Sequence, residues 1–149
     1  MAHYAKIDSA NIVTDVQCVN NWEITDANGI EIESKGVEIL ERVTGQTGWV
    51  KCSYNTYGNV HRLGGTPFRY NYPSKGDRYD SIKDAFIPQK PVDFPSYVFD
   101  EVNLIWVNPV PYPTGNPQDN LYVWNEVELK WIPNQNLAWF YKLESIYNF

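Results

Sequence analysis

Apolar and polar positions along the first third of the chain follow a strand period and then a helical one. Residues 12–19 are rich in β-branched side chains and partly alternate, and a polar turn at residues 8–11 precedes them, so a β-hairpin is predicted at the N-terminus. Residues 34–44 place apolar side chains near helical spacing, although Gly36 interrupts them, and Gly45 follows as a stop. These patterns predict a hairpin followed by one short helix.

A strand period returns after the predicted helix. Residues 49–54 alternate and predict a strand, whereas residues 55–67 are rich in Gly and Asn and indicate a loop or an irregular hairpin. Residues 88–117 hold seven prolines. Because proline lacks the N–H that a central strand donates, this stretch is predicted to form extended segments and turns that lie over a surface.

The second half of the chain repeats itself. Residues 97–107, YVFDEVNLIWV, and residues 122–132, YVWNEVELKWI, are identical at six of eleven positions. Each copy reads as a strand, a four-residue turn and a returning strand. A weaker third copy, YDSIKDAFIP, spans residues 79–88. The sequence therefore predicts three successive β-hairpins with proline-rich connectors, in a mainly β (α+β) fold.

Alternation within the hairpins predicts which side chains share a face. In the second copy Trp124 is expected to face Leu129, and Tyr122 to face Trp131; in the first copy Phe99 is expected opposite Leu104. The large aromatic positions of the three hairpins are Tyr79, Phe86, Tyr97, Phe99, Trp106, Tyr122, Trp124 and Trp131. They are interpreted first as the cores of the hairpins, with Trp106 and Trp131 largely buried.

Two alternatives for these aromatic side chains stay open. They are also suited to a protein interface, where aromatic anchors often dominate the binding energy. Four of them would serve as stacking platforms for sugar rings if they were exposed and coplanar: Tyr97, Trp106, Tyr122 and Trp131.

The pattern divides the chain into three parts. Residues 1–65 form a hairpin–helix–strand unit, and residues 66–133 form a repeated-hairpin unit that shares or adjoins its core. Residues 134–149 are an apolar tail, predicted to anchor the protein on its own domain or on a neighbouring chain. The candidate interface residues of the tail are Leu137, Trp139, Phe140, Tyr141, Ile146, Tyr147 and Phe149.

Charge narrows the class of partner. The net charge is −6, which disfavours binding to the phosphate backbone of nucleic acids and to anionic membranes. The longest apolar run, residues 137–141, is far too short to span a bilayer. The N-terminal residues lack an apolar signal core, so synthesis in a cytoplasm is expected.

Candidate metal ligands are few and poorly spaced. Cys18 and Cys52 lie 34 residues apart, and with His3 and His61 they match no zinc pattern. Both cysteines are expected to be reduced and mostly buried. No metal and no cofactor is predicted.

Candidate catalytic groups are equally sparse. Cys52 with His61 would be a thiol–imidazole pair, but a cysteine on a strand is usually a small core residue. The carboxylate pair Asp100–Glu101 falls in a predicted turn, where Asp serves the backbone. Gly64-Gly65 is followed by neither the Lys-Ser/Thr nor the helix of a phosphate-binding loop. The prediction is that the protein is not an enzyme.

Five segments resemble a known protein family when they are taken in order. They are MAHYAKID, WVKCSYNT, GGTPFRYNY, YDSIKDAFIP and PSYVFDEVNLIWVNPVPYP, the last followed by YVWNEVELKWIP. They resemble a family of small hypothetical and structural proteins of marine cyanobacterial phages and related tailed phages. Members begin like MAHFAKID and continue with W-x-x-TSYNT, DAFIPPKP and paired tryptophan-containing hairpins. The resemblance covers residues 1–133, although RYNYPSKGDRYD departs from the Gly-rich, Lys-bearing form of the family.

The resemblance implies a virion structural protein made in the host cytoplasm. Capsid decoration by docking on the major capsid protein is the first expectation. The alternative is a glycan- or receptor-binding module on the particle surface, or a tail or neck component. Phage capsid or tail proteins are the expected partners, with self-association as a further option.

Overall fold

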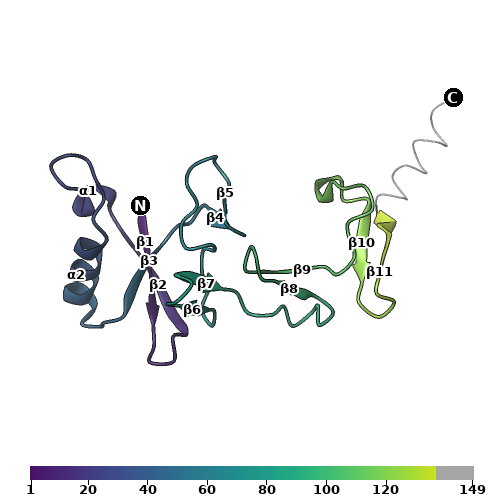
Figure 1. Ribbon diagram of the computed structural model, residues 1–149, viewed down its shortest axis with the longest axis horizontal. Coiled ribbons are helices and arrows are strands. Elements are labelled where there is room, and N and C mark those ends of the chain that lie inside the picture. The colour runs from purple at the N-terminus through teal and green to yellow at the C-terminus, as the bar shows by residue number, and fades with distance from the viewer. Residues whose placement is uncertain (137–149) are drawn as a thin grey trace. The chain divides into compact units, whose positions relative to one another are not determined.

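The computed structural model describes residues 1–136 of the chain. Strands account for 32% of the described residues, and two short helices accompany them there, so the predicted mainly β class is confirmed. The elements are β1 Ala2–Ile7, β2 Val13–Val19, α1 Asn21–Ile24, α2 Glu33–Thr44, β3 Trp49–Cys52, β4 Thr56–Tyr57, β5 Val60–His61, β6 Arg78–Asp80, β7 Ala85–Ile87, β8 Val98–Asp100, β9 Ile105–Val107, the 3₁₀ helix η1 Pro117–Asp119, β10 Tyr122–Asn125 and β11 Lys130–Pro133 (Figure 1).

The chain divides into two compact units. Unit 1 holds Met1–Gln89 together with Phe99–Ile105, and unit 2 holds Lys90–Val98 together with the described chain from residue 106 onward. The division predicted from the sequence, with boundaries at residues 65 and 133, stays a prediction.

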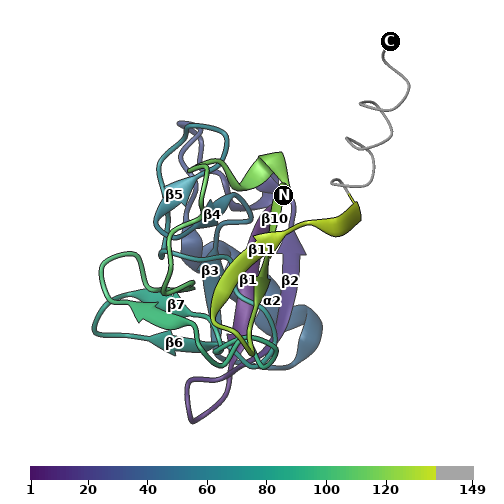
Figure 2. The same ribbon diagram turned by 90° about the vertical axis from the view of Figure 1, so that its right-hand side faces the viewer.

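Unit 1 is built on a three-stranded antiparallel sheet. β1 lies between β2 and β3 (Figure 2), with Tyr4 paired to Gln17 on one side and to Lys51 on the other. Alternation along β1 sends Tyr4 to the face that packs on the helices and Ala5 to the face that packs on Phe86 of the β6–β7 hairpin. The sheet therefore has a core on each face.

The predicted N-terminal hairpin and helix are confirmed. α2 ends at Gly45, whose φ of 68° is left-handed and whose N–H donates to the Glu41 carbonyl. The glycine that interrupts the helical pattern has a packing role, because a Cβ at Gly36 would clash with the buried Tyr4 ring and its hydroxyl oxygen. The predicted strand over residues 49–54 ends two residues early, at Cys52.

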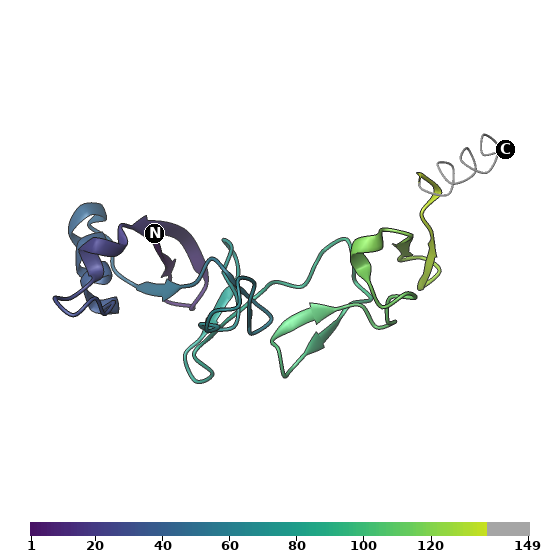
Figure 3. The same cartoon turned by 90° about the horizontal axis from the view of Figure 1, so that it is seen from above.

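Three hairpins, β6–β7, β8–β9 and β10–β11, close with the same turn. We call residues 80–84, 100–104 and 125–129 the hairpin turns; the β8–β9 hairpin is the green two-stranded ribbon of Figure 3. The first residue of each turn accepts backbone N–H bonds from the third and fourth residues through its side-chain oxygen, and the fifth residue is left-handed. The acceptors are Asp80, Asp100 and Asn125, and the left-handed residues are Asp84, Leu104 and Leu129.

The geometry of the turn shows that the predicted cross-strand pairs of the second copy are wrong. Trp124 pairs with Trp131, and Tyr122 with Pro133, rather than with Leu129 and Trp131. The physical reason is that Leu129 adopts a φ of 52° inside the turn, so the returning strand begins one residue later than alternation suggested. Leu104 likewise lies in the turn with a φ of 56°, before β9 begins, and is not a strand partner of Phe99.

One buried side chain joins three segments of unit 1. The Asn71 carboxamide oxygen accepts the Gly58 N–H at 2.8 Å, and its nitrogen donates to the carbonyls of Phe86 and Leu104, both at 2.9 Å. Asn71 is 2% exposed. It therefore ties the β4–β5 loop to the β6–β7 hairpin and to the turn between β8 and β9.

We expect Asn71→Ala to lower the free energy of unfolding by about 2–4 kcal/mol, because it leaves one buried N–H and two buried carbonyls without these partners. Urea unfolding followed by fluorescence measures the change. Asn28→Ala, at an exposed loop position, is the matched control and should shift stability by no more than about 0.5 kcal/mol. Equal effects of the two substitutions would contradict the role of Asn71.

Candidate functional site

A cleft of about 380 Å³ opens in unit 1 beside the ends of β1 and β3. Its walls include His3, Lys51, Tyr54, His61 and Phe68. This volume is within the range of small-ligand sites. The local contacts decide whether its polar groups are available for chemistry.

Two basic side chains of the cleft already have partners in the chain. The Lys51 ammonium donates to Glu31 Oε2 at 2.6 Å. His61 Nδ1 accepts the N–H groups of Leu63 and Gly65. Burial, together with the charge of the N-terminus, lowers the pKa of His3.

Cys52 and His61 both line the cleft, but they do not form a nucleophilic pair. Burial raises the pKa of the Cys52 thiol to about 12, so the thiol is protonated at neutral pH and is a poor nucleophile. Cys52 is buried as expected, whereas Cys18 is exposed, contrary to the prediction. Cys18 lies on β2, which pairs on one side with β1, and the β-branched pattern gave no sign of this edge position.

The sheet register brings together residues that the sequence spacing kept apart. His3 pairs with Cys18 on one side and with Cys52 on the other. Even so, within residues 1–136 no three His, Cys, Asp or Glu side chains are placed to hold a metal ion.

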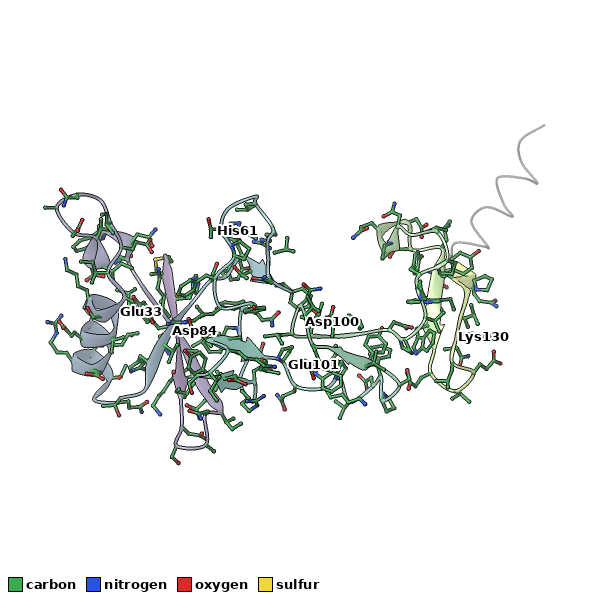
Figure 4. The ribbon with its side chains drawn as sticks, in the orientation of Figure 1. Glu33, His61, Asp84, Asp100, Glu101 and Lys130 are labelled. Carbon is green, nitrogen blue, oxygen red and sulfur yellow. The ribbon has the colours of Figure 1, made fainter. Side chains whose placement is uncertain are left out.

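Arg69 is the centre of a polar junction that the sequence analysis missed. Its Nη1 donates to Glu33 Oε1 at 2.6 Å and to the Lys51 carbonyl at 2.7 Å, and its Nε donates to Asp84 Oδ1 at 2.8 Å. Figure 4 shows Glu33 on the helix side of the sheet and Asp84 on the hairpin side. Arg69 thus joins α2, β3 and the first hairpin turn.

The Asp84 carboxylate and the Tyr79 phenol of this junction shift each other's pKa. The hydrogen bond from Tyr79, together with Arg69, holds the pKa of Asp84 below its ordinary value. Burial, together with the bond to Asp84, raises the pKa of Tyr79 to about 12. At neutral pH both groups are fixed in one protonation state, so the junction suits structural cohesion rather than proton transfer.

The hairpin aromatics are buried to different degrees. Among them Phe86 is fully buried, and Trp106 and Trp131 are partly buried, so their assignment to the cores of the hairpins stays a prediction. In unit 2 the Trp131 ring meets Tyr112 at 82° and Trp124 at 65°. These edge-to-face contacts make a small aromatic cluster, not a row of coplanar rings.

Unit 2 contains no fully buried residue among residues 90–98 and 106–136. Polar ties connect its segments instead. The Glu126 carboxylate accepts the N–H and hydroxyl of Ser96 at 2.6 and 2.8 Å and the Trp124 Nε1–H at 2.8 Å. Trp131 Nε1 donates to the Val110 carbonyl at 2.9 Å. The described part of unit 2 therefore leaves much aromatic surface half-covered.

Within the carboxylate pair Asp100–Glu101, Asp100 serves the turn, as predicted for Asp. Asp100 accepts the N–H groups of Val102 and Asn103, and these bonds lower its pKa. The Glu101 carboxylate forms an ion pair with the Lys83 ammonium of the first hairpin turn, at 3.4 Å. Figure 4 shows Asp100 and Glu101 at their turn.

The seven candidate interface residues of the tail, from Leu137 to Phe149, lie outside the described residues. Their role as an anchor stays a prediction.

No helix among residues 1–136 combines the length and apolar character that a membrane span requires.

The chain matches no protein-family model, no curated protein and no solved structure. The resemblance to phage proteins stays a prediction from the residues that carry it.

We expect one cysteine to react in the folded protein. Cys18 is exposed and Cys52 is buried with a pKa of about 12, so a thiol reagent at neutral pH should label one equivalent and should label the second only after unfolding in guanidinium chloride. Cys18→Ser is the matched variant and should abolish labelling of the folded protein. Two equivalents labelled at equal rates in the folded wild type would contradict these placements.

Stability should fall at alkaline pH through two tyrosines. Burial, more than any other cause, raises the pKa of Tyr4 and of Tyr79 to about 12, against about 10 in an unfolded chain. The stability they contribute is present below about pH 10 and is lost as pH rises toward 12. Absorbance titration at 295 nm should show a late-ionising fraction that shrinks in Tyr79→Phe.

Asp84→Asn provides the control for this titration, because removing the carboxylate that raises the pKa of Tyr79 should move part of the late fraction to lower pH. If every tyrosine of the folded wild type ionised near pH 10, the burial of these two phenols would be contradicted.

Proposed function

We propose that the protein is a structural component of a phage particle, and that it docks on the capsid shell as a decoration protein. One observation carries the proposal beyond the resemblance: the described part of unit 2 is rich in aromatic residues, yet none of its residues is fully buried. A surface of this kind gains most when a second protein covers it.

The energetics of small hairpins support this function. An isolated two-stranded hairpin is marginally stable in water, and β10–β11 is a two-stranded sheet. Its rings contact one another but leave apolar area in water. Covering that area would contribute roughly 25 cal/mol per Å² before the costs of association.

The geometry gives less support to the alternative, a glycan- or receptor-binding module. Sugar rings stack on flat, exposed aromatic faces, whereas Tyr112 meets Tyr122 and Trp131 edge to face, at 84° and 82°. The protein–protein interface is therefore the preferred use of these aromatics.

The test uses phage particles assembled from the parent genome without the gene for this chain. Purified protein is mixed with empty shells, with isolated tails and with host surface polysaccharide, and binding is measured by co-sedimentation. We expect saturable binding to shells at a fixed ratio to the major capsid protein.

Each other outcome of this test is informative. Binding to tails alone would make the chain a tail component, and binding to polysaccharide alone would favour the receptor module. Failure to bind any of the three would contradict a role in the particle.

A further inference from the structure

The third residue of every hairpin turn is an exposed aliphatic side chain. Ile82 is 96% exposed, Val102 78% and Val127 93%. In each turn the residues on either side of this position are polar: Ser81 and Lys83, Glu101 and Asn103, and Glu126 and Glu128. We call Ile82, Val102 and Val127 the tip residues.

The turn chemistry does not explain this choice of residue. The turn uses only the backbone N–H of its third position, which any residue except proline supplies. Two further Asp-initiated turns in unit 1, beginning at Asp8 and Asp26, use the same backbone donor with Ala10 and Asn28 there. A β-branched aliphatic residue is therefore not required to form an Asp-initiated turn.

Packing does not explain the tip residues either. Single exposed apolar residues are common on protein surfaces and need no explanation. Three at the same position of three equivalent turns, each leaving most of its side chain in water, form a pattern that belongs to the repeat itself. In the first two turns, Lys83 and Glu101, which adjoin Ile82 and Val102 in the sequence, form an ion pair.

The surroundings of the tips define the chemistry of a partner. The three hairpin turns together hold six acidic residues and one lysine. Four of the acids form ion pairs within the chain, Asp80 with Arg78, Asp84 with Arg69, Glu101 with Lys83 and Glu128 with Lys130, so the turns and these bases together keep an excess of negative charge. An aliphatic knob on an acidic turn fits a shallow apolar socket rimmed by Lys or Arg. Three equivalent knobs fit a partner that presents the same socket more than once, and a shell of identical subunits does so.

We propose that Ile82, Val102 and Val127 are the docking knobs of the protein, each inserted into an apolar socket with a basic rim on a repeating shell subunit. This inference rests on the proposed function and names the residues that perform it. It adds the turns to the docking surface that the partly buried aromatic residues of unit 2 supply.

The test replaces each knob by a β-branched polar residue: Ile82→Thr, Val102→Thr, Val127→Thr and the triple variant. Binding is measured by titration onto shells that lack the chain. Each single change should weaken binding roughly tenfold, and the triple change more than a hundredfold, because each removes one apolar contact from a multivalent set. Because the tips are exposed, melting temperatures should stay within about 2 °C of wild type.

Val92→Thr is the matched control, since Val92 is 95% exposed in unit 2 and lies outside the turns. It should bind as wild type does.

Binding of the wild-type protein to shells should also weaken as the salt concentration is raised, because the basic rim meets an acidic turn.

The outcomes separate the two proposals. If wild type binds shells and the folded triple variant binds equally well, the knobs are overturned while the decoration function stands. If Val92→Thr weakens binding as much as Val127→Thr, the turns have no special role and the inference also fails. If wild type does not bind shells at all, the proposed function falls and takes the knobs with it.

Discussion

The carboxamide of Asn71 holds unit 1 together at the point where its hairpins meet. Arg69 and Tyr70, just before it, both adopt left-handed conformations, with φ of 51° and 64°. Such conformations cost free energy for non-glycine residues and persist only where surrounding contacts fix them. Here the contacts are the three hydrogen bonds of Asn71 and the three that Arg69 donates. One short segment therefore connects the sheet, the helix and two hairpins.

Hydrogen bonds of this kind suit hairpins that are too small to bury a hydrophobic core of their own. The hairpins β6–β7, β8–β9 and β10–β11 have strands of three or four residues. Side-chain acceptors at the start of each turn fix the turn geometry, and ties such as Glu126 to Ser96 and Trp124 fix the neighbours. Because the turn bonds use only the backbone N–H of the third residue, the side chain at each tip is free to serve a partner.

Local patterns in the sequence predicted local structure well. The helix, its glycine stop and the first hairpin follow from period and turn chemistry, and the repeat correctly announced three hairpins. The pairing of Trp124 failed because alternation cannot show that Leu129 is left-handed within the turn. Alternation likewise could not show that the tip residues are exposed, although the repeated Ile or Val at the third turn position is visible in the sequence.

Long-range contacts were beyond the sequence signal. Asn71 bonds to Leu104 across 33 positions, and Arg69 to Glu33 across 36, and neither lies in a motif with a known role. The sequence also could not show what covers Trp106 and Trp131, because a repeat of large aromatic residues resembles a core whether the rings are covered by the chain or by a partner. The exposure of Cys18 was equally hidden, because Val13 and Val19 on the same strand are buried and the residue pattern did not separate them from Cys18.

Density of the intact particle tests the central claim most directly. Cryo-electron microscopy of the particle should show the chain at many equivalent positions on the shell, with the turns at residues 80–84, 100–104 and 125–129 in contact with shell subunits. A chain found on the shell with these turns facing solvent, or no chain on the shell at all, would contradict the account.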